Sequence, residues 1–157
     1  MKVLNFPTKR VAVGALIRDQ ASRLLLVKPV YREGWLLPGG VVDSDESPRS
    51  GLCRELREEL GLILEPQELL CVDYVSAHDN FADGLHLLFN GGVLSDDLIR
   101  ELTVCDSELH TLQWLVVEEA MNILIPSLAR RLRCLLMNAT DQVLYMENGE
   151  YVNLSHS

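Results

Sequence analysis

The segment from Gly40 to Leu62, GVVDSDESPRSGLCRELREELGL, carries the strongest local folding signal in the chain. Ser47 is a residue type that caps helix N-termini, Pro48 suits the first helical position, and Gly61 readily adopts the left-handed conformation that ends a helix. We therefore predict a helix from Pro48 to Leu60. Its buried side is marked by three leucines at helical spacing, Leu52, Leu56 and Leu60.

The same helix carries three glutamates, Glu55, Glu58 and Glu59, whose spacing of three and four residues brings their side chains to one face. Arg54 can pair with Glu58 one turn further on, which relieves only part of the repulsion between like charges. A hard divalent cation such as Mg²⁺, which prefers carboxylate oxygens, would neutralise the rest. For the three glutamates alone, a solvated acidic helix face is the alternative interpretation.

A longer pattern surrounds these glutamates. Five residues separate Gly40 from Glu46, and seven more precede the run Arg54-Glu55-Leu56-Arg57-Glu58-Glu59-Leu60-Gly61-Leu62. This pattern matches the Nudix box at every defined position, with seven fixed identities and two aliphatic positions in register. On these residues the chain resembles the Nudix hydrolases, and the elimination of other substrate classes given below favours the MutT-like group among them.

The resemblance implies an α/β fold, an α/β/α sandwich around a mixed β-sheet, formed by a single domain over residues 1–157. Nudix hydrolases cleave a nucleoside diphosphate linked to another group, with Mg²⁺ or Mn²⁺ held by the glutamates of the box. Carried over by position, the implied metal ligands are Glu55, Glu58, Glu59 and the carbonyl of Gly39. Arg54 would orient the glutamates, with Glu46 as its partner, and Glu58 and Arg54 are our candidate catalytic residues.

Two further positions are interpreted against the family pattern. Glu108 precedes Trp114 by six residues, and in MutT-type relatives a loop glutamate at this offset from a strand tryptophan joins the metal cluster. Glu108 is therefore our candidate fourth carboxylate, as a ligand or a general base, with an ordinary surface glutamate as the alternative. Gly51 stands where the family commonly has alanine, and we expect another backbone segment to approach it closely.

Substrate contacts are predicted at two places. Lys28, at the end of the second expected strand, could reach a substrate phosphate, unless it is simply an exposed lysine. His78, Asp79 and Phe81 lie in a polar loop between two expected strands, and loops at the rim of a rigid sheet commonly determine specificity. The alternative for these three residues is an ordinary hairpin loop.

The remaining elements are predicted from hydrophobic patterning and turn signals. We expect strands at 11–17, 23–27, 68–77 and 85–89, a further strand within 107–117, and a helix at 127–137. The basic residues of that helix, Arg130, Arg131 and Arg133, are expected in solvent, and the segment 98–105 stays open between strand and helix. A C-terminal β-hairpin at about 142–154 turns at Asn148-Gly149 and would cover an edge strand or pair with another subunit, which makes a homodimer one candidate assembly.

Composition limits the partners. The formal charge of −9 and the pI near 4.8 argue against a nucleic-acid polymer, because such binding needs basic patches that neutralise phosphates. No stretch approaches the length of a membrane span. The four cysteines lack metal-ligand spacing and are interpreted as reduced, mostly buried thiols of a cytoplasmic protein.

These observations predict Mg²⁺-dependent hydrolysis of a phosphoanhydride bond in a nucleoside diphosphate derivative, with Mn²⁺ as an alternative metal. The proline of ADP-ribose enzymes is replaced by Ala77 and His78, and the tyrosine of diadenosine-polyphosphate enzymes by Asp79 and Asn80. By elimination we predict a (d)NTP pyrophosphatase. The alternatives are a nucleotide-sugar or ADP-ribose-type diphosphate hydrolase and a non-catalytic Nudix domain that senses a nucleotide.

Overall fold

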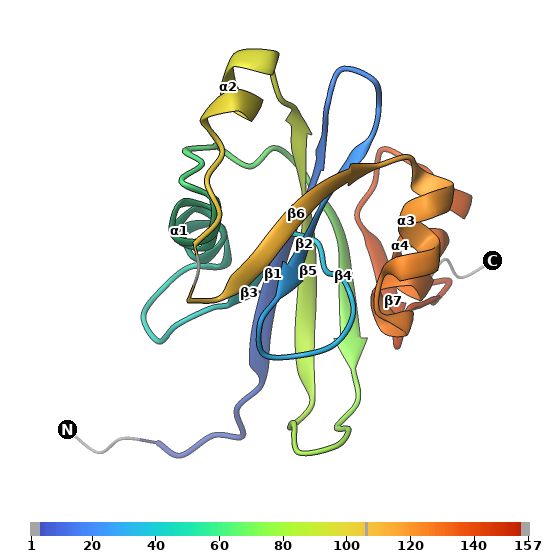
Figure 1. The fold of residues 1–157 in the computed structure, drawn as a ribbon. Coiled ribbons are helices and arrows are strands. Elements are labelled where there is room, and N and C mark those ends of the chain that lie inside the picture. The colour runs from blue at the N-terminus through green and yellow to red at the C-terminus, as the bar shows by residue number, and fades with distance from the viewer. Residues whose placement is uncertain (1–3, 106, 155–157) are drawn as a thin grey trace.

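A mixed β-sheet lies between α1 on one face and α3 and α4 on the other, as the computed structural model in Figure 1 shows. The structure describes residues 4–105 and 107–154, and in these residues eight strands form one sheet in the order β6-β2-β1-β5-β4-β7-β8, with β3 paired to β1. The strands are β1 (Arg10–Arg18), β2 (Leu24–Pro29), β3 (Gly39–Val41), β4 (Leu69–Val75), β5 (Gly84–Val93), β6 (Leu109–Leu115), β7 (Leu144–Glu147) and β8 (Glu150–Tyr151). The helices are α1 (Pro48–Leu60), α2 (Asp96–Glu101), α3 (Val117–Ile123) and α4 (Pro126–Met137). The predicted α/β/α sandwich is confirmed.

Strand β1 is the central wall of the molecule. It runs parallel to β5 along its whole length, and its alternating side chains enter two separate cores. Val13, Ala15 and Ile17 pack with α1, whereas Leu16 packs with α4. A strand covered on both faces needs apolar residues at consecutive positions, which is why the sequence of β1 reads as a nearly continuous apolar run.

Helix α1 begins and ends where its sequence predicts. The Ser47 hydroxyl accepts a hydrogen bond from the Ser50 amide at 3.1 Å, and Pro48 occupies the first turn. Gly61 ends the helix with a φ of 63°, in the left-handed region that favours glycine. The three predicted leucines are fully buried against β1 and β2, so the polar side of the helix has a fixed direction.

The opposite face of the sheet is covered by α3 and α4. The predicted second helix is confirmed as α4, whose Leu128 and Leu132 pack on Leu16 and Leu88 of the sheet. Helix α3 was not expected from the sequence, and the open segment 98–105 contains the end of the short helix α2. In the part of the chain that the structure describes, no helix is both long and apolar enough to cross a membrane.

The expectation that Arg131 lies in solvent is wrong, because its side chain is buried. Its Nε donates a hydrogen bond of 2.7 Å to Oδ2 of Asp73 on β4, which is also buried. Oδ1 of Asp73 accepts a hydrogen bond from the Gly149 amide at 3.0 Å. One carboxylate therefore ties α4, β4 and the C-terminal hairpin together.

The C-terminal hairpin consists of β7 and β8, which pair in antiparallel fashion around Asn148 and Gly149. Both turn residues have positive φ, 53° and 78°, the geometry for which this dipeptide is suited. Strand β7 runs parallel to β4, so the hairpin covers what would otherwise be the edge of the sheet.

Removing Asp73 tests the contribution of the buried ion pair. The Asp73→Ala variant leaves the Arg131 guanidinium buried without a counter-charge, and we expect a loss of about 3 to 5 kcal/mol in the free energy of unfolding, measured by urea denaturation. The matched control is Asp97→Ala, which breaks the exposed pair between Asp97 and Arg100. That variant should stay within about 0.5 kcal/mol of the parent. Equal effects of the two substitutions would contradict the role assigned to Asp73.

Candidate active site

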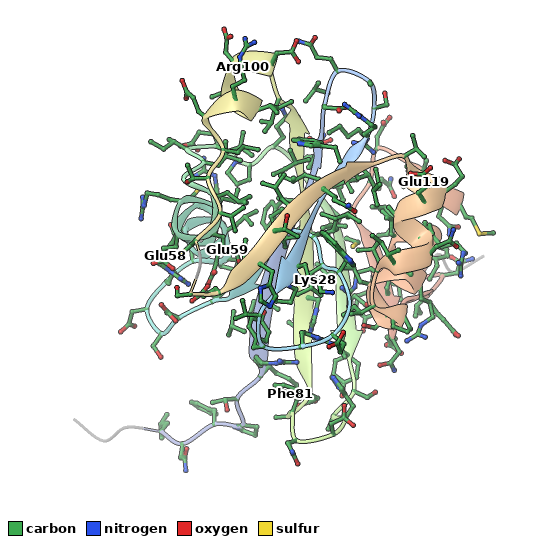
Figure 2. The ribbon with its side chains drawn as sticks, viewed as in Figure 1. Lys28, Glu58, Glu59, Phe81, Arg100 and Glu119 are labelled. Carbon is green, nitrogen blue, oxygen red and sulfur yellow. The ribbon has the colours of Figure 1, made fainter. Side chains whose placement is uncertain are left out.

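Three carboxylates converge at the end of α1. Oxygen atoms of Glu55, Glu59 and Glu108 lie within 4.8 Å of one another. Glu55 and Glu59 are one helical turn apart on α1, and Glu108 comes from the segment just before β6. Figure 2 shows Glu58 and Glu59 on α1, close to the start of β6. The structure thus places the predicted fourth carboxylate, Glu108, beside two of the three box glutamates.

Glu58 lies outside this group. Its side chain is half-exposed, and its Oε2 accepts a hydrogen bond of 3.2 Å from Nη1 of Arg54. The physical reason is the helical rotation of about 100° per residue, which directs Glu58 toward solvent when Glu55 and Glu59 face the sheet. A role for Glu58 as a metal ligand or in catalysis stays a prediction.

Arg54 is the main counter-charge of the box. Its Nε and Nη2 bind the two oxygens of Glu46 at 2.7 and 2.9 Å, and its Nη1 donates to Oε1 of Glu55 at 2.9 Å. The hydrogen bonds from Arg54 lower the pKa of Glu46 to about 2. The guanidinium is therefore largely committed to Glu46, which holds it in the position from which it contacts Glu55.

Glu59 receives no such compensation. Among the described residues it forms no ion pair, and its side chain accepts a long hydrogen bond of 3.4 Å from the Gly39 amide. It is 6% exposed, and burial together with the nearby Glu55 carboxylate raises the pKa of Glu59 to about 8. Burial likewise raises the pKa of Glu55. Without a cation the Glu59 carboxyl is therefore mostly protonated at pH 7, and a bound cation would stabilise its ionised form.

The residues fit a hard divalent cation. All three converging groups offer carboxylate oxygens, the ligand atoms that Mg²⁺ and Mn²⁺ prefer, and a soft metal would call for sulfur or imidazole ligands instead. Glycine makes the close packing possible, because a Cβ on Gly40 would lie 2.4 Å from Cδ of Glu55. Gly39 has a φ of 149°, and a Cβ there would lie 2.0 Å from the Val13 carbonyl oxygen. A role for the Gly39 carbonyl as a ligand stays a prediction.

Gly51 differs from our expectation. The nearest atom to a Cβ at this position is Oε1 of Glu46, at 2.8 Å, followed by the Val42 side chain. A side chain rather than another backbone segment therefore occupies the space beside Gly51. The glycine lets the Glu46 carboxylate lie against the helix, where it holds Arg54.

A pocket of about 380 Å³ adjoins the carboxylates. Its boundary is the segment from Trp35 to Val41, which enters the sheet between β1 and β2. Leu36 exchanges two backbone hydrogen bonds with Val27 of β2, and Gly39 is paired with Gly14 of β1. Gly39 and Gly40 touch the carboxylates of α1 and also line the pocket, so the two features share one wall.

The predicted substrate residues lie at different distances from this pocket. Phe81 lines it and is labelled in the β4–β5 loop in Figure 2. His78 packs on the Phe81 ring with centroids 5.7 Å apart, whereas Asp79 is an exposed residue with positive φ. Lys28 lines a neighbouring open cavity, which shares Tyr31 and Arg32 with the pocket. Contacts of all four residues with substrate stay predictions.

Several pocket residues were not singled out from the sequence. Arg10, Arg32, His86, Ser127 and Arg131 all line it. They come from β1, the loop after β2, β5 and α4, and no local spacing relates them. The one available signal was a basic residue immediately before a predicted strand, as Arg10 is before 11–17.

Comparisons with known proteins identify the family. The family model of the NUDIX domain matches residues 8–144, which is most of the chain. The structure also resembles the crystal structure of a MutT NUDIX hydrolase from Burkholderia pseudomallei, with a TM-score of 0.64 and 30% sequence identity, over 85% of this chain and 100% of that one.

Two curated relatives match over a shorter stretch. A MutT-like protein from Streptomyces ambofaciens is 38% identical over 63 residues, which are 40% of this chain and 41% of that protein. An RNA pyrophosphohydrolase from Xanthomonas oryzae pv. oryzae is 41% identical over 61 residues, which are 39% of this chain and 30% of that protein. The match therefore spans less than half the length of these relatives.

Metal binding can be tested without measuring turnover. We expect Mg²⁺ or Mn²⁺ at about a hundred times its Kd to raise the unfolding temperature by about 5 to 10 °C, and a chelator to reverse the shift. The Glu59→Gln variant should lose most of this shift, because it lacks the uncompensated buried charge. The exposed Glu65 supplies the control, since Glu65→Gln should respond like the parent. A metal-dependent shift that is the same in Glu59→Gln would argue against the site.

The buried His86 is expected to make the free energy of unfolding depend on pH. Burial, with the nearby positive charges of Arg131 and Arg10, lowers its pKa to about 4, against opposition from Asp73. The unfolded state, with the ordinary value of 6.5, therefore binds more protons between pH 6.5 and 4, and stability falls as pH falls through that window. Between pH 7 and pH 5 the parent should lose about 1 to 2 kcal/mol more than His86→Phe. Denaturant unfolding of both proteins at the two pH values measures this, and parallel losses would contradict it.

Proposed function

The chain belongs to the NUDIX domain family, and from this premise we propose that it hydrolyses a phosphoanhydride bond in a nucleoside diphosphate derivative. The observation that carries the proposal is the convergence of Glu55, Glu59 and Glu108 beside a pocket that is apolar on most sides and lined by basic residues. Mg²⁺ is the metal we propose, with Mn²⁺ as a substitute.

Each part of the site has a task in this reaction. Glu55, Glu59 and Glu108 would hold the metal, which supplies charge neutralisation and polarises the scissile phosphate when bound. Arg54 holds the Glu55 carboxylate in place from its own fixed position on Glu46. Glu108 is exposed, so its free oxygen can accept a proton from the attacking water. We retain Glu58 as a second candidate for the group that accepts that proton.

A nucleoside triphosphate or deoxynucleoside triphosphate is our proposed substrate. The pocket volume and its mixture of apolar walls with a few polar groups are typical of small-molecule sites. The net charge of −9 supports a small nucleotide over a nucleic-acid polymer. Because one matching relative is named an RNA pyrophosphohydrolase, an RNA with a 5′-triphosphate belongs among the substrates to be tested.

The cysteines support a reducing compartment. Each of Cys53, Cys71, Cys105 and Cys134 is free in the structure, and burial raises the pKa of Cys71 to about 12. Such a thiol is chemically inert. We therefore propose a cytoplasmic location.

The activity is tested by incubating the protein and Mg²⁺ with a panel of (d)NTPs, ADP-ribose, a nucleotide sugar and 5′-triphosphate RNA. We expect a triphosphate to yield a monophosphate and pyrophosphate, whereas a sugar nucleotide would yield two monophosphates. Glu59→Gln and Glu58→Gln should each lower kcat/KM by about 100-fold or more, and Glu65→Gln should leave it unchanged.

Product release at the same rate from the parent and from Glu59→Gln would overturn the proposal. Tight nucleotide binding without turnover under any divalent metal would instead indicate the sensing domain. Cleavage of ADP-ribose or the nucleotide sugar alone would replace the triphosphate by the alternative diphosphate substrates.

A further inference from the structure

Two buried nitrogen atoms in the pocket lack a partner. Among the buried side-chain nitrogen and oxygen atoms of the described residues, Nε of Arg10 and Nε2 of His86 are the two without a hydrogen bond, and both residues line the pocket of about 380 Å³. Buried polar groups in folded proteins are almost always hydrogen-bonded, and an unpaired one destabilises the fold. Two unpaired nitrogens on one pocket wall therefore indicate groups that a ligand satisfies.

The sheet brings these two residues together. Arg10 and His86 lie on the adjacent parallel strands β1 and β5, and His86 is in register with Ala12. Arg10, Ala12 and Gly14 are every second residue of β1 and therefore lie on the same face of the strand. Ala12 has a small side chain and Gly14 has none, which leaves space in the pocket beside Arg10. The Arg10 guanidinium carbon lies 4.7 Å from the centroid of the Phe81 ring, a cation–π contact that restricts its position.

The pocket wall is basic although the protein is acidic. None of the residues that line it is an aspartate or a glutamate, and neither Arg10 nor Arg32 forms an ion pair with a described acid. The charge of Arg131 is matched by Asp73, so the unbalanced positive charge lies with Arg10 and Arg32. Burial and the nearby arginines lower the pKa of His86 to about 4, which leaves its ring neutral at pH 7.

The position of Arg10 along β1 gives its distance from the expected phosphate site. Gly14 pairs with Gly39 beside the carboxylates, and Arg10 lies four residues earlier on β1, about 13 Å away at the rise of a strand. A nucleoside whose phosphates lie at the carboxylates extends over a comparable length. Its base, or the sugar of the second substituent, would reach Arg10 and His86.

We propose that Arg10 and His86 determine substrate specificity by binding an acceptor oxygen on the part of the substrate remote from the scissile phosphates. Arginine is always a donor, and we assign the proton of the neutral His86 ring to Nε2, which makes that nitrogen a donor as well. An acceptor oxygen then satisfies both nitrogens, whereas an amino group would leave donors facing one another in a buried space. The oxygen has two sources, the carbonyl of a nucleobase or the acid group of a sugar. This inference rests on the proposed function, since it assumes that a nucleotide occupies the pocket.

The first experiment uses monophosphates, which cannot be cleaved at an anhydride. IMP and AMP differ at position 6 of the purine, oxygen against amino group, and UMP and CMP differ in the same way at position 4 of the pyrimidine. By titration calorimetry with Mg²⁺ we expect IMP and UMP to bind about tenfold more tightly than AMP and CMP. Arg10→Met and His86→Phe should each abolish this preference while the weaker ligands bind as before.

The control is Arg133→Met, which removes an exposed arginine of α4 outside the pocket and should keep the preference. Arg10→Lys keeps a positively charged donor that cannot accept a hydrogen bond, and it should retain part of the preference that Arg10→Met loses. Thermal unfolding of every variant confirms that it is folded. A second arm compares UDP-glucuronate with UDP-glucose, and a preference for the acid in this arm alone identifies the sugar as the source of the oxygen.

Equal binding within every pair, or a preference that survives both Arg10→Met and His86→Phe, would overturn the inference. A failure of the proposed function would give a different result, because the binding of a monophosphate does not require the enzyme to turn over. A protein that cleaves no substrate and still distinguishes IMP from AMP would contradict the hydrolase and support the role of Arg10 and His86.

Discussion

The structure depends on how the single guanidinium of Arg54 is shared among the glutamates of the box. Arg54 contacts Glu46, Glu55 and Glu58, and no described cation pairs with the buried Glu59. A carboxylate in that position destabilises the folded chain unless it is protonated or a cation joins it. The fold accepts this because α1 is held by its caps and by leucines that are fully buried, contacts that do not depend on the charge state of the site.

The segment from Trp35 to Val41 connects this charge to the rest of the molecule. It enters between β1 and β2 and hydrogen-bonds to both strands. Its glycines form the wall that the carboxylates of α1 and the pocket share. Gly39 and Gly40 are needed at this crossing, since a side chain at Gly39 would collide with the Val13 backbone and one at Gly40 would displace the Glu55 carboxylate. Sheet architecture and site geometry are therefore set by the same few residues.

Local chemistry made part of this predictable. The bounds of α1 and the pairing of Arg54 with Glu58 follow from caps and helical spacing, and the turn at Asn148 and Gly149 from its dipeptide. Glu58 departs from its neighbours because the helix rotates it toward solvent, a detail that depends on which side of α1 packs on the sheet. The burial of Arg131, which was expected in solvent, and the pocket position of His86 could not be predicted. Both arise from the parallel pairing of β1 with β5 and the docking of α4, which are contacts between residues far apart in sequence.

The distribution of charge also bears on how an acidic protein attracts an anionic ligand. A net charge of −9 repels polyphosphates at long range, but charges beyond about 10 Å are largely screened at physiological ionic strength. Inside the pocket the nearest charges are arginines, and the surrounding apolar side chains lower the local dielectric and strengthen their effect. Screening thus removes most of the long-range repulsion. At the site itself, Arg10 and Arg32 attract the anion from the pocket wall, and a bound cation would offset the nearby carboxylates of Glu55, Glu59 and Glu108.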